Sequence, residues 1–381
     1  MRAVIYLDNA ATTAPNEDVL QAYLQANQSV YYNPNSPHKA GLQAAQLLEQ
    51  SKSQINQILN LNDEFDIIFT SGATESNNMA LKGLAYRKKD SAPVIITSLL
   101  EHPSVLEVVR ALGEEGFTVK YCNVTREGRL DTQHLKSLMS SEVGLVSCMQ
   151  VNNIMGQRQP VREVAQIVAD YPKAFLHVDA VQAVGKVPLE TEGVESLSVS
   201  GHKFNGLKGQ GLLLIRNKHH LEPIIQGGGQ EYGLRSGTVN LPMDIAIVKA
   251  LKANVQNMDA NYTRIQGLSD DLRQFIAQYP GVHLNTPEGA LPHILNIGFP
   301  GVKGEVLVNA FSQHNVMIST TSACSSKQSK LNEVLLAMHI DETRIEGSIR
   351  VSLGNKTTEA DIEQFKQAFE AVYQEVKELL R

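Results

Sequence analysis

The stretch Phe175-Leu-His-Val-Asp-Ala-Val-Gln182 begins as a short apolar strand and closes on an acidic residue, Asp179. A carboxylate at the end of a buried strand is costly unless it meets a cation or a strong hydrogen-bond donor. The segment Leu197-Ser-Val-Ser-Gly-His-Lys-Phe204 follows the same plan, because His202 and Lys203 come directly after an apolar run. Since ligands of parallel sheets bind beyond the carboxyl ends of the strands, we expect the acid and the lysine to lie together at that edge.

Short apolar runs alternate with amphipathic segments from about residue 65 onward, which predicts an α/β fold. The expected strands cover residues 66–70, 94–97, 118–122, 144–150, 174–178, 196–200 and 211–215. Helical patterns lie between them, for instance at residues 74–88, 104–115, 131–140 and 161–171. This order predicts a large domain built on an open, mostly parallel seven-stranded sheet with helices on both faces.

The C-terminal third of the chain has a different pattern. Residues 245–275 form a long helical pattern that no strand repeat follows, so we expect it to link to a smaller, mixed α/β domain. The last segment places apolar residues at helical spacing, and we interpret this stripe as core packing. The stripe consists of Ile362, Phe365, Phe369, Val372 and Val376.

The composition excludes several classes of partner. Over 381 residues, 34 Lys+Arg stand against 40 Asp+Glu, which gives a formal net charge of -6. No long basic run stands out, so we expect no direct binding of nucleic acid. The first fifteen residues turn polar too quickly for a signal peptide, and no apolar stretch approaches membrane-spanning length. We therefore expect a cytoplasmic protein without membrane contact.

The three cysteines fall into two kinds. They form no C-x-x-C pair, so neither a metal site nor a disulfide framework is indicated. Cys122 and Cys148 sit in apolar runs and are expected to be buried strand residues. Cys324 lies in Ser319-Thr-Thr-Ser-Ala-Cys-Ser-Ser-Lys327, a stretch of small polar residues without periodicity. That stretch predicts a loop with an accessible thiol.

A third motif completes a possible cofactor site. In Phe69-Thr-Ser-Gly-Ala-Thr-Glu-Ser-Asn-Asn78 an expected strand ends at a glycine turn and a helical pattern starts at once. The free amides of residues 72–74 would form an anion site at this helix N-terminus, although such a segment alone more often marks a simple N-cap. Pyridoxal phosphate needs a Schiff-base lysine, a carboxylate for its pyridinium nitrogen and a helix N-terminus for its phosphate. Lys203, Asp179 and this turn supply the three parts.

These motifs are similar to those of the cysteine desulfurases, in the class V aminotransferase family of pyridoxal-phosphate enzymes. The resemblance spans nearly the whole chain, from Tyr6-Leu-Asp-Asn-Ala-Ala-Thr-Thr13 to Ser348-Ile-Arg-Val-Ser-Leu-Gly354. It implies the pyridoxal-phosphate transferase fold type I, with a large cofactor-binding domain at residues 16–255. It also implies that residues 1–15 and 256–381 form the small domain, which carries a catalytic cysteine loop at about residues 319–330.

The resemblance implies roles for individual residues at the cofactor. Lys203 resembles the lysine that forms the Schiff base, Asp179 the partner of the pyridine nitrogen, and His102 a residue that stacks on the ring and shuttles protons. Gln182 and Asn153 are similar to the groups that hydrogen-bond the phenolic oxygen and hold the substrate. The implied phosphate contacts, to which the 72–74 turn belongs, are Gly72, Ala73, Thr74, Ser200, His202 and Thr238.

Other implied roles concern the substrate, cysteine. Arg350 resembles the clamp for its carboxylate, a task that suits the planar fork of arginine. Asn33 and His38 match an early loop near the mouth of the site. Cys324 resembles the nucleophile that takes the sulfur as a persulfide and leaves alanine. Its small, polar flanks look like the longer mobile loop of the class that supplies sulfur to scaffold and tRNA-modifying proteins.

The same resemblance predicts partners and leaves alternatives. Thr238 matches a phosphate contact that a second subunit donates, which implies a homodimer, and the long cysteine loop implies a sulfur-acceptor protein. A selenocysteine lyase or another class V lyase or aminotransferase would keep the fold and the cofactor, although Cys324 in its loop speaks against a transaminase. A third hypothesis makes the protein mainly a sulfur-relay platform, whose turnover an acceptor stimulates.

Overall fold

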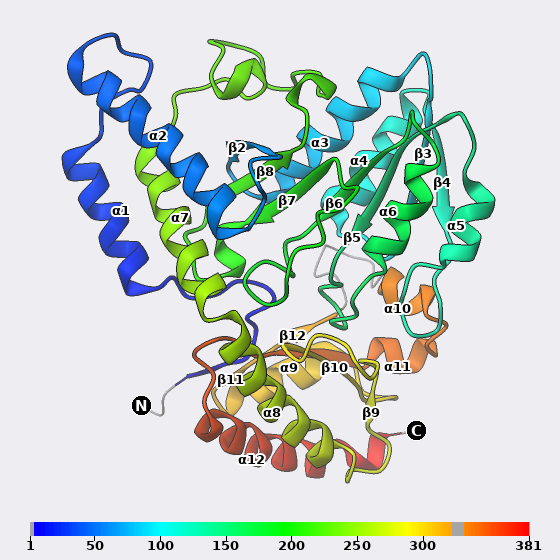
Figure 1. Ribbon diagram of the computed structural model, residues 1–381. Helices are drawn as coiled ribbons and strands as arrows, with labels where there is room; N and C mark the ends of the chain where they lie inside the picture. Colours follow the sequence, from blue (N-terminus) through cyan, green and yellow to red (C-terminus); the bar gives the residue numbers. More distant parts are fainter. Residues whose placement is uncertain (1–3, 322–330, 381) are drawn as a thin grey trace.

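The computed structural model describes residues 4–321 and 331–380 of the chain (Figure 1). Its centre is a seven-stranded sheet in the order β2-β8-β7-β6-β5-β3-β4. The strands are β2 (Asp66–Thr70), β3 (Val94–Ser98), β4 (Thr118–Cys122), β5 (Val143–Met149), β6 (Phe175–Asp179), β7 (Ser196–Ser200) and β8 (Gly211–Ile215). β8 runs antiparallel to both β2 and β7, whereas the other neighbouring pairs are parallel. The predicted α/β fold with a mostly parallel sheet is thus confirmed.

Helices cover both faces of this sheet because its strands are apolar on both sides (Figure 1). In β2, for example, Ile67 and Phe69 belong to one core cluster and Ile68 to the other. The first cluster packs against α1 (Glu17–Ser29), α2 (Lys39–Ile58), α5 (Thr132–Leu138), α6 (Val161–Ala169) and α7 (Leu241–Gln256). The second packs against α3 (Ala73–Lys88) and α4 (Pro103–Glu114).

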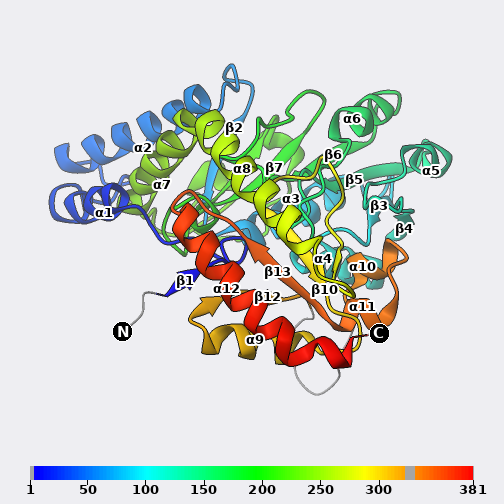
Figure 2. The same ribbon diagram turned by 90° about the horizontal axis from the view of Figure 1, so that it is seen from below.

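A second unit lies beside one end of the large sheet (Figures 1 and 2). Its four-stranded sheet has the order β12-β13-β10-β9. Its strands are β9 (His283–Leu284), β10 (Ile294–Gly298), β12 (Ser319–Thr320) and β13 (Ser348–Ser352), and its helices are α8 (Met258–Ile276), α9 (Gly304–Gln313), α10 (Glu333–Ala337), α11 (Glu342–Glu346) and α12 (Glu359–Val376).

The two ends of the chain meet in this second unit. Strand β1 (Ile5–Tyr6) pairs in parallel with β11 (Val316–Met317), and Asp8 forms an isolated parallel bridge to Ser352. Ile5 and Leu7 are buried in the same apolar cluster as α8, α9 and α12. The predicted apolar stripe of α12 lies in this cluster, so its interpretation as core packing is confirmed. The domain boundaries at residues 15 and 255 stay a prediction.

The sequence pattern placed most elements within one residue of their bounds, but two expectations were wrong. The helical pattern at 245–275 is two helices, α7 and α8, which meet at Asn257. Ser319 and Thr320, expected in the cysteine loop, pair instead with Arg350 and Ile349 of β13. Sheet pairing with a distant strand overrides the local preference of this polar segment.

Cys122 and Cys148 are buried in β4 and β5, as expected. Burial raises the pKa of the Cys122 thiol to about 12. Cys324 lies outside the described residues. In the part of the chain that the structure describes, no helix is both long and apolar enough to cross a membrane.

Candidate active site

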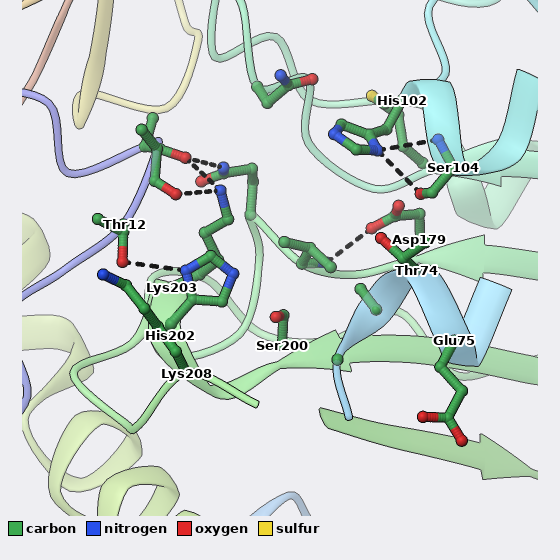
Figure 3. Close-up of a pocket in the computed structure, with 18 of the residues that line it drawn as sticks. Thr12, Thr74, Glu75, His102, Ser104, Asp179, Ser200, His202, Lys203 and Lys208 are labelled. Carbon is green, nitrogen blue, oxygen red and sulfur yellow. Dashed lines mark hydrogen bonds between the residues drawn. The ribbon is translucent and has the colours of Figure 1, made fainter. Parts of the chain in front are cut away.

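A cavity of about 650 Å³ opens at the carboxyl edge of the large sheet (Figure 3). Its walls come from the ends of β6 and β7, from the first turns of α3 and α4, from the N-terminal segment and from Arg350 of β13. Lys203 reaches into it from one side, and Asp179 and His102 face it from the other (Figure 3). The sheet therefore brings together residues that the sequence analysis selected from separate segments.

Lys203 follows β7 in a single turn of 3-10 helix (Gly201–Lys203). Its Nζ donates hydrogen bonds to the carbonyl oxygens of Ala10 and Ala11, both at 2.7 Å. Burial and the positive charge of Arg350 lower the pKa of the amine to about 8, while the carboxylates of Asp179 and Asp8 act in the opposite direction. A considerable fraction of this lysine is thus uncharged near pH 8, as a nucleophilic amine requires.

Asp179 is the last residue of β6 and is 6% exposed. Its Oδ1 accepts a hydrogen bond from the backbone N–H of Val181 at 3.0 Å, and its Oδ2 accepts one from Asn77 Nδ2 at 3.0 Å. Among the ion pairs of the described residues Asp179 has no partner within 4 Å. A buried carboxylate without an ion-pair partner favours the binding of a cation from the cavity.

His102 precedes α4 as its N-cap, and its side chain is exposed to the cavity. Nδ1 accepts the backbone N–H of Ser104 at 3.1 Å and lies 2.8 Å from the hydroxyl oxygen of the same residue. Partial loss of hydration lowers the pKa of the imidazole; the charge of Asp179 raises it and that of Lys203 lowers it. The ring is therefore mainly neutral at pH 7.

The phosphate-binding turn lies where the motif predicted it. Gly72 has a φ of 150°, which side-chain-bearing residues rarely adopt, and α3 starts directly after it. No side chain of the described chain caps this helix, so its first N–H groups remain available to an anion. Thr74 and Ser200 line the cavity beside this turn. Figure 3 shows both below Asp179.

His202 lines the cavity next to Lys203. Its Nδ1 lies 3.1 Å from the hydroxyl of Thr12, and its backbone carbonyl accepts a hydrogen bond from the hydroxyl of Thr13. Burial and the charge of Lys203 lower its pKa to about 4. His202 is therefore a neutral polar group at this wall and does not act as a second cation.

Arg350 enters the cavity from the second unit. Nη2 binds Asp8 at 2.9 Å and Nη1 donates to the carbonyl of Asn153 at 3.0 Å. Nε has no hydrogen-bond partner among the described residues, although it is buried. The guanidinium has five N–H groups, so it retains donors for a carboxylate beside Asn153.

Gln182 holds its amide in one orientation. Its Nε2 donates to the carbonyl of Ala10 at 3.0 Å, and its Oε1 accepts from Lys186 Nζ at 3.0 Å. Burial, with the charge of Lys203, lowers the pKa of Lys186 to about 7. The amide N–H side of Gln182 is thus turned toward the Lys203 side of the cavity.

Glu101 lies beneath the site and is 3% exposed. Its Oε1 accepts the backbone N–H of Met149 at 2.6 Å. Burial and the negative charge of Asp179 raise its pKa to about 8. Glu101 is therefore mostly a neutral acid at pH 7.

Some predicted site residues lie apart from this cavity. Asn33 and His38 are exposed and do not line it; His38 caps α2 by accepting the N–H of Gly41. Thr238 lines a neighbouring cavity of about 250 Å³, together with Arg235. Cys324 lies outside the described residues.

Several partners of the predicted residues were not expected from the sequence. These are the Ala10 and Ala11 carbonyls, Asp8, Asn77, Ser104 and Lys186. The N-terminal segment carries part of the resemblance, but backbone carbonyls form no sequence motif. Asn77 could have been found, because a polar residue on the buried face of a predicted helix needs a partner.

Comparison with known proteins agrees with this geometry. The family model described as "Aminotransferase class-V" matches residues 5–365. The chain belongs to the class-V aminotransferase family. Within that family, the "NifS/IcsS protein homolog" of Lactobacillus delbrueckii subsp. bulgaricus is 39% identical over 376 residues, which cover 97% of each protein. The "Cysteine desulfurase IscS" of Dictyoglomus turgidum is 36% identical over 381 residues, 99% of this chain and 96% of that protein.

Solved structures of similar proteins share the fold of this chain. A "NifS-like protein" has a TM-score of 0.92 at 35% identity and covers 98% of this chain and 100% of its own. "SspA in complex with cysteine" has a TM-score of 0.80 at 29% identity, over 93% of this chain and 99% of that one.

Class-V aminotransferases of this kind depend on pyridoxal phosphate, and the residues present fit that group. Lys203 supplies the amine, the uncompensated carboxylate of Asp179 suits a pyridinium nitrogen, and the uncapped N-terminus of α3 suits a phosphate. The cavity that joins these three features has a volume typical of cofactor sites.

Proposed function

We propose that this protein is a cysteine desulfurase, which converts L-cysteine to L-alanine and transfers the sulfur to Cys324 as a persulfide. The observation that carries the proposal is the single cavity lined by Lys203, Asp179 and Arg350. The names of the relatives support the reaction, and the cysteine complex of the structural neighbour supports the substrate. A transaminase or selenocysteine lyase would use the same cavity, but the names of these relatives do not favour it.

The residues of the chain divide the work. Arg350 binds the carboxylate of cysteine with the N–H groups that Asp8 and Asn153 leave unused. Lys203 would take up the α-proton of the bound cysteine, because its pKa of about 8 makes the uncharged amine accessible near neutral pH. The cofactor, when bound, supplies the electron sink for the carbanion.

Sulfur transfer then involves the cysteine loop. The thiolate of Cys324 attacks the substrate sulfur, so that an S–S bond forms and the C–S bond breaks. The electron pair of the broken bond stays on the β-carbon of the substrate, which takes up a proton, and the α-carbon regains the proton that Lys203 removed, which gives alanine. The sum is one cysteine and one thiol converted to alanine and one persulfide, with no other oxidant or reductant.

Mass analysis after incubation with cysteine tests the proposal. We expect one added sulfur on the peptide that contains Cys324, and none on the buried Cys122 and Cys148. Cys324→Ala should abolish sulfide release and leave the visible absorbance of the bound cofactor unchanged. Full alanine production by Cys324→Ala would instead favour the lyase or aminotransferase alternative.

We further propose a homodimer with shared sites and a sulfur-acceptor protein, such as an iron–sulfur scaffold or a tRNA-thiolation enzyme. Thr238 supports the dimer, because it lies outside the cavity of its own chain. Hybrid dimers of Thr238→Ala with Lys203→Ala test this: activity in the hybrid should depend on which chain carries each change. Alanine release that a candidate acceptor fails to accelerate would count against the relay hypothesis.

A further inference from the structure

Asn77 connects Asp179 and His102, the two groups that face the cavity from the same side. It lies on α3, is completely buried, and points at the end of β6. Its Nδ2 lies 3.0 Å from Asp179 Oδ2 and 2.9 Å from the hydroxyl of Ser104, and its Oδ1 lies 3.0 Å from His177 Nε2. Both N–H hydrogens and the oxygen of the amide are therefore used.

The carboxylate fixes which way this amide points. An ionised carboxylate accepts hydrogen bonds and donates none, so Nδ2 must face Asp179 and Oδ1 must face His177. His177 must then carry its proton on Nε2, and its Nδ1 accepts the hydroxyl of Ser196 at 2.8 Å. Burial lowers the pKa of His177 to about 3, in keeping with a neutral ring held in one tautomer.

The second hydrogen of Asn77 Nδ2 sets the direction of the hydroxyl of Ser104. Because this hydroxyl accepts from Asn77, its own hydrogen is free to point at Nδ1 of His102, 2.8 Å away. The backbone N–H of Ser104 donates to the same nitrogen. Nδ1 of His102 thus has two donors, so the proton of the neutral ring lies on Nε2, the nitrogen turned toward the cavity in Figure 3.

We propose that Asn77 is a positioning residue that sets the hydrogen-bond polarity around both groups: it keeps Asp179 an acceptor and, through the hydroxyl of Ser104, reinforces the Nε2–H tautomer of His102 that the backbone N–H of Ser104 also favours. The catalytic role of this arrangement rests on the proposed function, which the inference deepens. In that reaction His102 delivers a proton and Lys203 takes one up. The shuttle role that the resemblance implied for His102 would then begin with a donated proton.

Histidine-selective ¹⁵N NMR of the full-length protein, with and without pyridoxal phosphate, tests the arrangement directly. The signals of His102 and His177 are identified by their loss in single His→Gln variants. In the wild type we expect both rings as Nε2–H tautomers at neutral pH. An Nδ1–H tautomer at either ring would overturn the proposal, because the chain of donors would then run the other way.

A pH titration of the same signals measures the contribution of Asn77. Two donors on Nδ1 stabilise the neutral ring against the negative charge of Asp179, which favours protonation, and act in the same direction as the positive charge of Lys203. Ser104→Ala removes one donor, and Asn77→Ala frees the hydroxyl of Ser104 to turn away from Nδ1. Either change should raise the proton affinity of His102 roughly fivefold. Ser104→Ala keeps the test valid if Asn77→Ala does not fold.

Asn78→Ala is the matched control, because Asn78 is the next residue of α3 and its amide bonds only the Thr74 carbonyl among the described residues. It should leave both histidine signals unchanged. Asn77→Asp, which places a second carboxylate beside Asp179, should weaken pyridoxal-phosphate binding by at least roughly tenfold. A loss of thermal stability in the Asn77 variants with His102 and cofactor affinity unmoved would show a merely structural role. None of these readouts requires turnover, so they separate this inference from the proposed function.

Discussion

Replacement of Lys203 by methionine measures how strongly the cavity resists a buried ammonium group. Burial and the charge of Arg350 lower the pKa of Lys203 from 10.5 to about 8, against the opposing carboxylates of Asp179 and Asp8. A shift of this size corresponds to ~3 kcal/mol between the charged and neutral amine. In the cofactor-free protein this cost applies fully below pH 8, where the amine is protonated in the folded state.

The sign of the pH dependence follows from the order of the two pKa values. The folded-state pKa lies below that of the unfolded chain, so between them the unfolded chain binds more protons. The free energy of unfolding of the wild type therefore rises with pH in this range. The charge penalty, ~3 kcal/mol at pH 7, falls to roughly 1.4 kcal/mol at pH 9.5.

Methionine at position 203 removes this dependence. It also loses the two hydrogen bonds to Ala10 and Ala11, worth ~1 kcal/mol each, but this loss is nearly the same at both pH values. We expect Lys203→Met to be ~1 kcal/mol more stable than the wild type at pH 7 and slightly less stable at pH 9.5. The change between the two pH values, ~2 kcal/mol, is the decisive quantity.

Urea unfolding of cofactor-free protein at both pH values, followed by circular dichroism, measures it. Lys208→Met is the matched control, because this lysine lies in the same loop with an exposed side chain and should give no such difference. A stability difference between Lys203→Met and the wild type that does not vary with pH would refute the argument that the cavity desolvates this amine.

Three further substitutions address the other walls of the site. Arg350→Lys keeps a charge beside Asp8 but loses the planar fork, so the KM for cysteine should rise about tenfold with a smaller effect on kcat; an unchanged KM from steady-state kinetics would contradict the clamp. Asp179→Asn removes the anionic partner, and absorbance titration should show pyridoxal phosphate bound at least roughly tenfold more weakly, whereas equal affinity would exclude the pyridinium contact. The folded-state pKa of Glu101, about 8, exceeds its ordinary value, so wild-type stability falls as pH rises from 4.5 to 8. Glu101→Gln should flatten that part of the melting-temperature profile, and a parallel profile would show that Glu101 does not titrate there.

Much of the fold was predictable because its signals are local. β2, β4, β7 and β8 have the bounds that the apolar runs indicated. β7 and β8 are buried along their whole length, and their apolar runs are the clearest signal. The break between α7 and α8 was missed because neither glycine nor proline marks it. Asn257 ends one helix and precedes the next, and the apolar pattern continues across it.

The site divides in the same way. Lys203, Asp179 and the Gly72 turn were predictable, because the rule that ligands bind beyond strand ends acts within single motifs. The pairing of Asp8 with Arg350 joins residues 342 positions apart, so no spacing in the sequence reveals it. The carbonyls that hold Lys203 were missed for another reason: every residue has a carbonyl, and only the fold decides which ones converge.

Substrate and cofactor are held by different parts of the fold, and the N-terminal segment joins them. Asp179 ends β6 of the large sheet and Lys203 lies in the turn after β7, whereas Arg350 lies on β13 of the small sheet. Residues 8–11 contact both, because Asp8 pairs with Arg350 while the carbonyls of Ala10 and Ala11 accept from Lys203. The same segment is anchored to the small sheet by the bridge from Asp8 to Ser352. The distance between the amine and the carboxylate clamp is therefore set by a short stretch of backbone with two ends fixed, and geometry of that kind positions a small amino acid without a large specificity pocket.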